Sequence, residues 1–127
     1  FCDIADLKLI RKFEKKKIVQ GFTTNPSLMR KAGARNYQLY SKQILNLCKK
    51  KPVSLEVFAD DLKSMTKQGL SINSWGKNIY VKVPIVNTKN KFTGKVIKQL
   101  NALVPVNPTF YALDVTLNGA HHVLHSK

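Results

Sequence analysis

Short segments rich in β-branched residues alternate with segments of helical periodicity, and this alternation constrains the fold more than any other feature. Segments with strand character are expected at 1–4, 18–25, 53–59, 78–84 and 104–109. Helices are expected at 6–16, 26–32, 37–50, 60–69 and 94–103, where apolar residues recur every three or four positions. Strand and helix in alternation, five times over, predict an α/β protein with a parallel sheet.

Length and composition are consistent with one domain over residues 1–127. The chain has 127 residues and is 43% apolar, which suffices for a single core. No apolar run reaches about 18 residues, so no membrane span is expected. No secretory signal pattern opens the chain. Its two cysteines have neither metal nor disulfide-framework spacing. A reduced, cytoplasmic protein is therefore expected.

The charge is strongly basic, with 22 Lys and Arg against 7 Asp and Glu and a net charge of +15. Such a field attracts anions, nucleic acid among them. The lysine triplets at 15–17 and 49–51 lie where helices are expected to end, a position that suits cations. No aromatic-rich basic strand, glycine-rich arm or zinc spacing accompanies them. A small basic nucleic-acid-binding protein is thus the alternative from another class, supported by charge alone.

The strand segments carry polar residues on one face only. Side chains alternate along a strand, so in NIYVKVP (78–84) Lys82 lies opposite the β-branched residues. In VSLEVF (53–58) Glu56 has the corresponding position, and in VPVNPT (104–109) Asn107 and Thr109 do. One face of each strand is therefore uniformly apolar. The other is mixed, with its polar group toward the carboxyl end.

This arrangement favours a (β/α)8 TIM barrel, in which the inward strand faces form the active site at the carboxyl-terminal rim. The polar residues expected to converge there are Asp3, Asn25, Glu56, Lys82, Asn107 and Thr109. A doubly wound open sheet, the competing fold, buries both strand faces and usually carries a glycine-rich phosphate fingerprint, which is absent here. A closed barrel needs roughly 200 residues or more, so about five of its eight βα units are present.

Lys82 raises a question of chemistry. A buried lysine needs charged partners or becomes neutral. A neutral amine in an apolar barrel attacks carbonyl carbons and forms a Schiff base. A structural ion pair between Glu56 and Lys82 explains the pattern equally well. The residues alone leave both alternatives open.

Three motifs carry a family resemblance. GFTTNPSLMRKAG (21–33), PVSLEVFADD (52–61) and NIYVKVP (78–84) occur in that order, and together they resemble the transaldolase family in the small form that includes fructose-6-phosphate aldolases. The opening FCDIADLKLI resembles the family's first strand and its aspartate, and the match runs from Phe1 to about Leu103. The resemblance implies class I aldol chemistry on sugar phosphates in the pentose phosphate pathway, with no metal and no cofactor.

The resemblance also implies roles for individual residues. Lys82 matches the Schiff-base lysine, and Asp3 matches the acid/base of carbon–carbon cleavage. Glu56 matches the acid/base that acts through a water during Schiff-base formation. The residues that match substrate-binding positions are Thr23, Asn25, Asn107 and Thr109, the last as a water-positioning hydroxyl. Glutamate at position 56 favours transaldolase over fructose-6-phosphate aldolase, where glutamine is usual.

The end of the chain departs from the family pattern. Pro105 and Pro108 fall inside the expected fifth strand, where proline cannot donate to the ladder. Residues 110–127 read as a divergent, weakly helical tail. In it His121 and His125 would share a helix face, but with no carboxylate nearby we expect no metal site.

The resemblance covers the N-terminal portion of the family only. No position here matches the arginine and serine that hold the substrate phosphate in later strands. The chain is therefore expected to be a fragment, inactive alone, and a non-catalytic remnant stays open. The expected partners are sugar phosphates, with neither membrane nor nucleic acid, and a homo-oligomer stays open.

Overall fold

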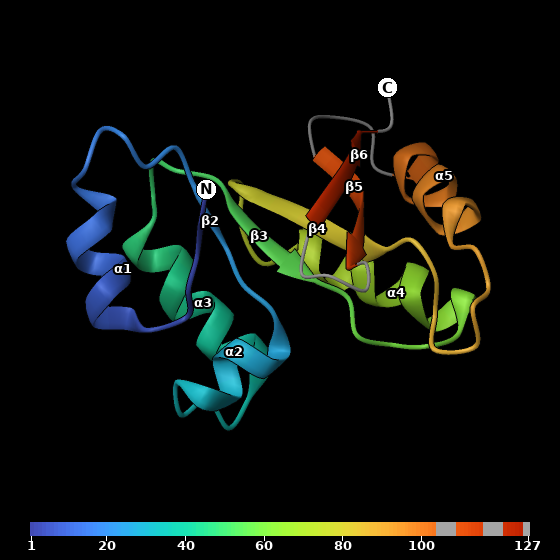
Figure 1. The fold of residues 1–127 in the computed structure, drawn as a ribbon, viewed down its shortest axis with the longest axis horizontal. Coiled ribbons are helices and arrows are strands. Elements are labelled where there is room, and N and C mark those ends of the chain that lie inside the picture. Colours follow the sequence, from blue (N-terminus) through green and yellow to red (C-terminus); the bar gives the residue numbers. More distant parts are fainter. Residues whose placement is uncertain (104–108, 116–120, 126–127) are drawn as a thin grey trace.

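The computed structural model describes residues 1–103 in full and the backbone of residues 109–115 and 121–125. Within these residues one sheet runs in the order β1-β2-β3-β4-β5-β6 (Figure 1). Its strands are β1 Cys2–Asp3, β2 Phe22–Thr23, β3 Val53–Glu56, β4 Ile79–Pro84, β5 Thr109–Val115 and β6 His121–His125. Strands β1 to β5 pair in parallel, each with the next, and β6 pairs antiparallel with β5. The predicted α/β class with a sequentially ordered parallel sheet is confirmed.

Helices follow the strands as the alternation predicts. They are α1 Leu7–Glu14, α2 Pro26–Lys31, α3 Tyr37–Leu47, α4 Leu62–Asn73 and α5 Gly94–Leu103. Figure 1 shows α1 to α3 beside the N-terminal strands, α4 beside β4, and α5 next to α4. The first four each begin at a side chain that accepts the backbone N–H three residues on, namely Asp6, Asn25, Asn36 and Asp61. Helix α2 ends before Gly33, whose φ of 93° suits glycine.

The core lies between the sheet and these helices. The odd-numbered residues of β3 and β4, and Val57 directly after β3, are all buried, as the face alternation predicts: Val53, Leu55, Val57, Ile79, Val81 and Val83. They cluster with helix residues such as Ile44, Met65 and Leu100. Each fully buried side chain of this size contributes about 1.5–3 kcal/mol. This apolar face fixes the opposite, mixed face toward the inside of the curved sheet.

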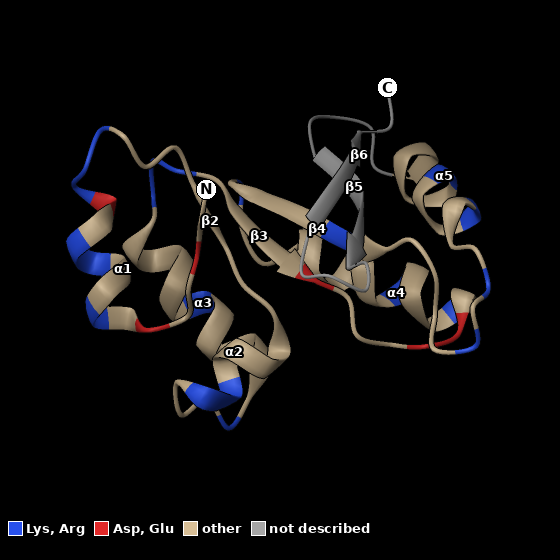
Figure 2. Ribbon diagram, viewed as in Figure 1, with Lys and Arg blue, Asp and Glu red and all other residues tan. Residues whose placement is uncertain are grey.

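Apart from Lys82 in β4, the basic residues that the structure describes lie on the helices and on the connecting loops (Figure 2). Lys15 forms the carboxyl-terminal cap of α1. The Lys51 ammonium donates a 2.8 Å hydrogen bond to the Lys16 carbonyl, so the loops before β2 and β3 meet. Positive charge at helix ends is what the lysine triplets predict.

The C-terminal part corrects two predictions. The fifth strand was expected at 104–109; residues 104–108 lie outside the described part, and β5 begins at Thr109. The tail was expected to be weakly helical, but TFYALDV and HHVLH form the strands β5 and β6, which pair antiparallel. His121 and His125 thus share a strand, about 13 Å apart rather than one helical turn.

The second strand is also shorter than predicted. Residues 18–25 were expected to be extended, but β2 holds Phe22 and Thr23 only. Ile18 is 89% exposed in the preceding loop, where its β-branched side chain packs against no sheet neighbour. Among the described residues, no helix combines the length and the apolar character that crossing a membrane requires.

Candidate active site

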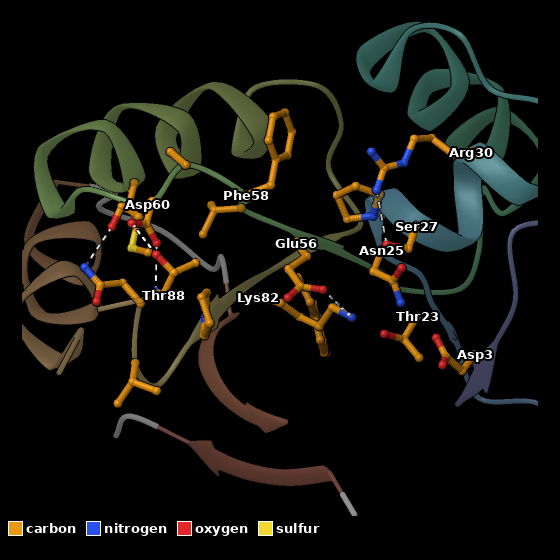
Figure 3. Close-up of a pocket in the computed structure, with 18 of the residues that line it drawn as sticks. Asp3, Thr23, Asn25, Ser27, Arg30, Glu56, Phe58, Asp60, Lys82 and Thr88 are labelled. Atoms are coloured by element: carbon orange, nitrogen blue, oxygen red, sulfur yellow. Dashed lines mark hydrogen bonds and ion pairs between the residues drawn. The ribbon is translucent and has the colours of Figure 1, made fainter. Parts of the chain in front are cut away.

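A pocket of about 930 Å³ opens at the carboxyl ends of β1 to β4 (Figure 3). Parallel strands end at the same edge of the sheet, so their last inward side chains meet there. The predicted site residues that line the pocket are Asp3, Thr23, Asn25, Glu56 and Lys82. They come from four neighbouring strands and the turn into α2.

Lys82 and Glu56 form the centre of the site. The register of β3 and β4 pairs them directly, and both point inward because each precedes or follows an outward-facing valine. The Lys82 Nζ lies 3.5 Å from Glu56 Oε2, and Lys82 is only 3% exposed. Lys82 nevertheless lines the pocket, so a ligand in the pocket can approach this side chain. Lys82 can therefore form the ion pair with Glu56 and still face a ligand in the pocket.

Opposing influences act on the Lys82 ammonium. Burial lowers its pKa from the ordinary 10.5, while the carboxylates of Glu56 and Asp3 raise it. The burial effect is larger, so the pKa is lowered on balance. A lysine with a lowered pKa supplies more neutral amine than a surface lysine does at the same pH.

Asp3, Thr23 and Asn25 form the side of the pocket nearest β1 (Figure 3). Thr23 pairs with Asp3 in the register of β1 and β2. The Asn25 Oδ1 accepts a 2.9 Å hydrogen bond from the Leu28 amide and so caps α2. This bond fixes the side chain at the pocket wall, which makes Asn25 both a structural cap and a candidate ligand contact.

The remaining two predicted site residues, Asn107 and Thr109, belong to the C-terminal part of the chain. Asn107 lies outside the described residues. Thr109 is the first residue of β5, where its backbone pairs with Tyr80, two residues before the level of Lys82. The prediction had Thr109 at the carboxyl end of its strand, so that strand boundary is corrected.

Sequence reasoning missed two contributors to the pocket surroundings. Arg30 of α2 lies at the rim and donates a 3.3 Å hydrogen bond to Ser27. Tyr37 binds the backbone of Glu56 from α3. Arg30 follows the TTNP motif by one helical turn, which could have indicated it. Nothing in the sequence connects Tyr37 with a residue 19 positions later.

Asp60 ties the loops after β3 and β4 together at the rim. Its carboxylate accepts hydrogen bonds from the Thr88 amide at 2.8 Å and the Thr88 hydroxyl at 2.7 Å. The Asn87 side-chain amide donates to the Asp60 carbonyl at 3.0 Å. The hydrogen bonds from Thr88 hold the pKa of Asp60 below its ordinary value. Among the residues that the structure describes, no group of three or more His, Cys, Asp or Glu side chains is arranged to hold a metal.

Comparison with known proteins gives consistent results. The sequence model of the Transaldolase/Fructose-6-phosphate aldolase family matches residues 1–110. A probable transaldolase of Parabacteroides distasonis is 39% identical over 110 residues, 82% of this chain and 50% of that protein. A probable transaldolase of Dehalococcoides mccartyi is 35% identical over 99 residues, 78% of this chain and 46% of that protein. A probable transaldolase of Mesorhizobium japonicum is 34% identical over 117 residues, which are 92% of this chain and 53% of that protein.

The chain thus spans about half the length of these curated relatives. The family match includes each of the three motifs and the strands that hold Asp3, Glu56 and Lys82. With a match over residues 1–110 and several relatives of the same kind, the chain belongs to the transaldolase/fructose-6-phosphate aldolase family.

Proposed function

We propose that this protein carries the Schiff-base half of a transaldolase, which transfers a dihydroxyacetone unit between sugar phosphates. The observation that supports this most directly is the buried amine of Lys82, on the pocket wall and 3.5 Å from Glu56. Family membership supports an aldol reaction, and the lowered pKa of Lys82 supports a nucleophilic role. In this proposal the enzyme acts in the pentose phosphate pathway and is located in the cytoplasm.

In the first step the neutral amine of Lys82 attacks the C2 carbonyl of a ketose phosphate. The resulting carbinolamine loses its hydroxyl as water and becomes a protonated imine. Glu56 carries the protons for this dehydration through a water molecule, because it is the carboxylate nearest Nζ. Thr23 and Asn25 hold substrate hydroxyls, and the family resemblance assigns Asn107 and Thr109 to the substrate site as well.

In the second step Asp3 takes the proton of the C4 hydroxyl. The C3–C4 bond breaks, its electron pair moves into the iminium to give an enamine, and an aldose phosphate leaves. The enamine carbon then attacks the aldehyde of an acceptor, and water releases the new ketose from Lys82. Two carboxylates in different surroundings suit two separate proton transfers.

A fructose-6-phosphate aldolase would share every step except the last, releasing free dihydroxyacetone. Glu56 favours transfer, since the aldolases resembled here usually have glutamine at that position. Product analysis separates the two: a transaldolase needs an acceptor aldose, whereas an aldolase accumulates dihydroxyacetone without one.

The test is reductive trapping. Fructose 6-phosphate with borohydride should leave an adduct on Lys82 in the chain completed with the C-terminal half of a relative. The 127-residue chain alone should trap fructose 6-phosphate weakly, because no residue here is assigned to the substrate phosphate. It should still trap dihydroxyacetone, which has no phosphate.

Mass mapping of the adduct decides the outcome. Lys82→Arg should abolish trapping, because guanidinium stays protonated and is no usable nucleophile. The exposed rim residue Lys89 provides the control, and Lys89→Arg should trap like the unaltered chain. Modification of a lysine other than Lys82 would refute the mechanism.

A further inference from the structure

Tyr37, the first residue of α3, makes two hydrogen bonds to the backbone of Glu56. Its hydroxyl donates to the Glu56 carbonyl at 2.9 Å and accepts from the Glu56 amide at 3.0 Å. One oxygen thus serves both backbone groups of the residue whose carboxylate faces Lys82. The reaction steps above do not use Tyr37.

The reason for this contact lies in the ladder between β2 and β3. The Phe22 amide donates to the Pro52 carbonyl at 2.9 Å, and the Thr24 amide donates to the Ser54 carbonyl at 3.2 Å. Continued two residues further, this register would bring position 26 to the Glu56 carbonyl. Residue 26 is proline, which has no N–H, and there the chain turns into α2. The Tyr37 hydroxyl donates to this part-buried carbonyl instead.

The ring of Tyr37 is held on two sides. It packs edge-on against Phe58 at 5.2 Å and against Trp75 at 5.9 Å between ring centroids. Burial raises the pKa of Tyr37 far above its ordinary value of 10.0. The phenol therefore stays protonated, and remains a hydrogen-bond donor, over the whole range in which Lys82 titrates.

We propose that Tyr37 is a positioning residue for Glu56, which fixes the end of β3 so that the Glu56 carboxylate faces the Lys82 amine. That the orientation of Glu56 matters for catalysis rests on the proposed function. That Tyr37 sets this orientation is independent of it. The charged side chains that line the pocket are Asp3 of β1, Arg30 of α2, Glu56 of β3, Asp60 of the following loop and Lys82 itself. Of these, Glu56 is the one whose backbone Tyr37 binds.

The variant Tyr37→Phe removes one oxygen and leaves the ring between Phe58 and Trp75. Tyr40→Phe is the matched control: Tyr40 lies on the same helix, and its hydroxyl donates a 2.7 Å hydrogen bond to a backbone carbonyl, that of Ala5. Tyr37→Phe loses two hydrogen bonds to a backbone and Tyr40→Phe loses one, but only Tyr37→Phe releases Glu56. Circular dichroism and melting temperature establish that both chains fold.

The first readout is the titration of Lys82, followed by NMR through its 13Cε resonance and assigned with Lys82→Arg. Glu56 raises the pKa of Lys82, so a carboxylate that moves away lets the midpoint fall. We expect a lower midpoint in Tyr37→Phe and an unchanged one in Tyr40→Phe. The second readout, the rate of dihydroxyacetone trapping, should fall about tenfold in Tyr37→Phe, since a misplaced proton carrier slows imine formation.

An unchanged Lys82 midpoint in Tyr37→Phe would overturn the inference. So would a Tyr37→Phe chain that fails to fold while Tyr40→Phe folds, because the hydroxyl would then hold the whole domain and not one carboxylate. If the unaltered chain forms no adduct at Lys82, the proposed function fails. The NMR midpoint still decides the role of Tyr37 in that case.

Discussion

At the scale of single residues, the chemistry of this chain depends on how the sheet isolates one ammonium group from water. Lys82 is nearly fully buried on the inner face of β4. Burial penalises its charged form, whereas Glu56 and Asp3 stabilise it. The balance lowers the pKa of Lys82, so a larger fraction of its amine is neutral at a given pH than in a surface lysine.

The first prediction concerns pH. Because the pKa of Lys82 is lowered, the rate of dihydroxyacetone trapping should rise with pH through a midpoint below 10.5. In Glu56→Gln the midpoint should be lower still, because the carboxylate that raises this pKa is gone. The rate of adduct formation at Lys82, measured by mass spectrometry across pH, tests both. A midpoint at or above 10.5 in the unaltered chain would contradict the burial argument.

The second prediction separates the two carboxylates, in the chain completed with the C-terminal half of a relative. Glu56→Gln should slow imine formation by about a hundredfold or more, the usual worth of a general acid/base. Asp3→Asn should leave trapping by fructose 6-phosphate intact and slow turnover by a similar factor. Asp61→Asn, which retains an N-cap outside the pocket, serves as control. Equal loss of trapping in both pocket variants would disprove the division of labour.

These residues also show what sequence can predict about the site. Asp3, Glu56 and Lys82 could be brought together from sequence, because strand alternation and parallel order dictate which side chains share an edge. Tyr37 could not. Its contact with Glu56 depends on how α3 packs on the sheet and on a donor that Pro26 lacks, and neither follows from a local pattern.

At the scale of elements, the Asp60 carboxylate joins the loops that follow β3 and β4 at the pocket rim. Asp60 accepts two hydrogen bonds from Thr88, which stabilise its charged form and lower its pKa. This contact is therefore complete above the ordinary pKa of 3.8 and is lost as the pH falls through the lower folded-state value.

The third prediction follows from that sign. The Thr88 amide proton resonance should titrate with a midpoint below 3.8, and Asp60→Asn should remove the titration. NMR spectra recorded from neutral to acidic pH measure this directly. A midpoint above 3.8 would mean that the rim hydrogen bonds do not form in solution.

Element boundaries were predicted less well than element types, for physical reasons. Ile18 has a β-branched side chain, but no strand neighbour reaches it, so β2 begins only at Phe22. A residue's preference for strands depends on whether its side chain packs against neighbouring strands. The local sequence does not show whether such neighbours are present. For the tail the element type itself was wrong, because TFYALDV and HHVLH show no regular strand alternation and the antiparallel pairing of β5 with β6 is not a local pattern.

At the scale of the whole molecule, a curved parallel sheet is combined with a net charge of +15. The fold is of the TIM-barrel type with about five βα units, in agreement with the family. Large apolar side chains stay exposed near the rim, namely Phe58, Val86 and Phe92. Apolar contact favours self-association, whereas the shared positive charge opposes it.

The fourth prediction concerns the balance between apolar attraction and charge repulsion in self-association. The 127-residue chain should scatter light as a small species at low salt and associate at 1 M salt, where the Debye length is about 3 Å. The apparent mass at 1 M salt should also rise with protein concentration. A strictly monomeric, cooperatively unfolding species under both conditions would rule out exposed apolar surface as a driving force.

The sequential order of the sheet has a consequence for biosynthesis. Each strand from β2 to β5 pairs with the strand made just before it. On the ribosome, each strand from β2 to β5 therefore meets a partner that has already been translated. Assembly can proceed vectorially, one βα unit at a time, with translation setting its direction and its pace.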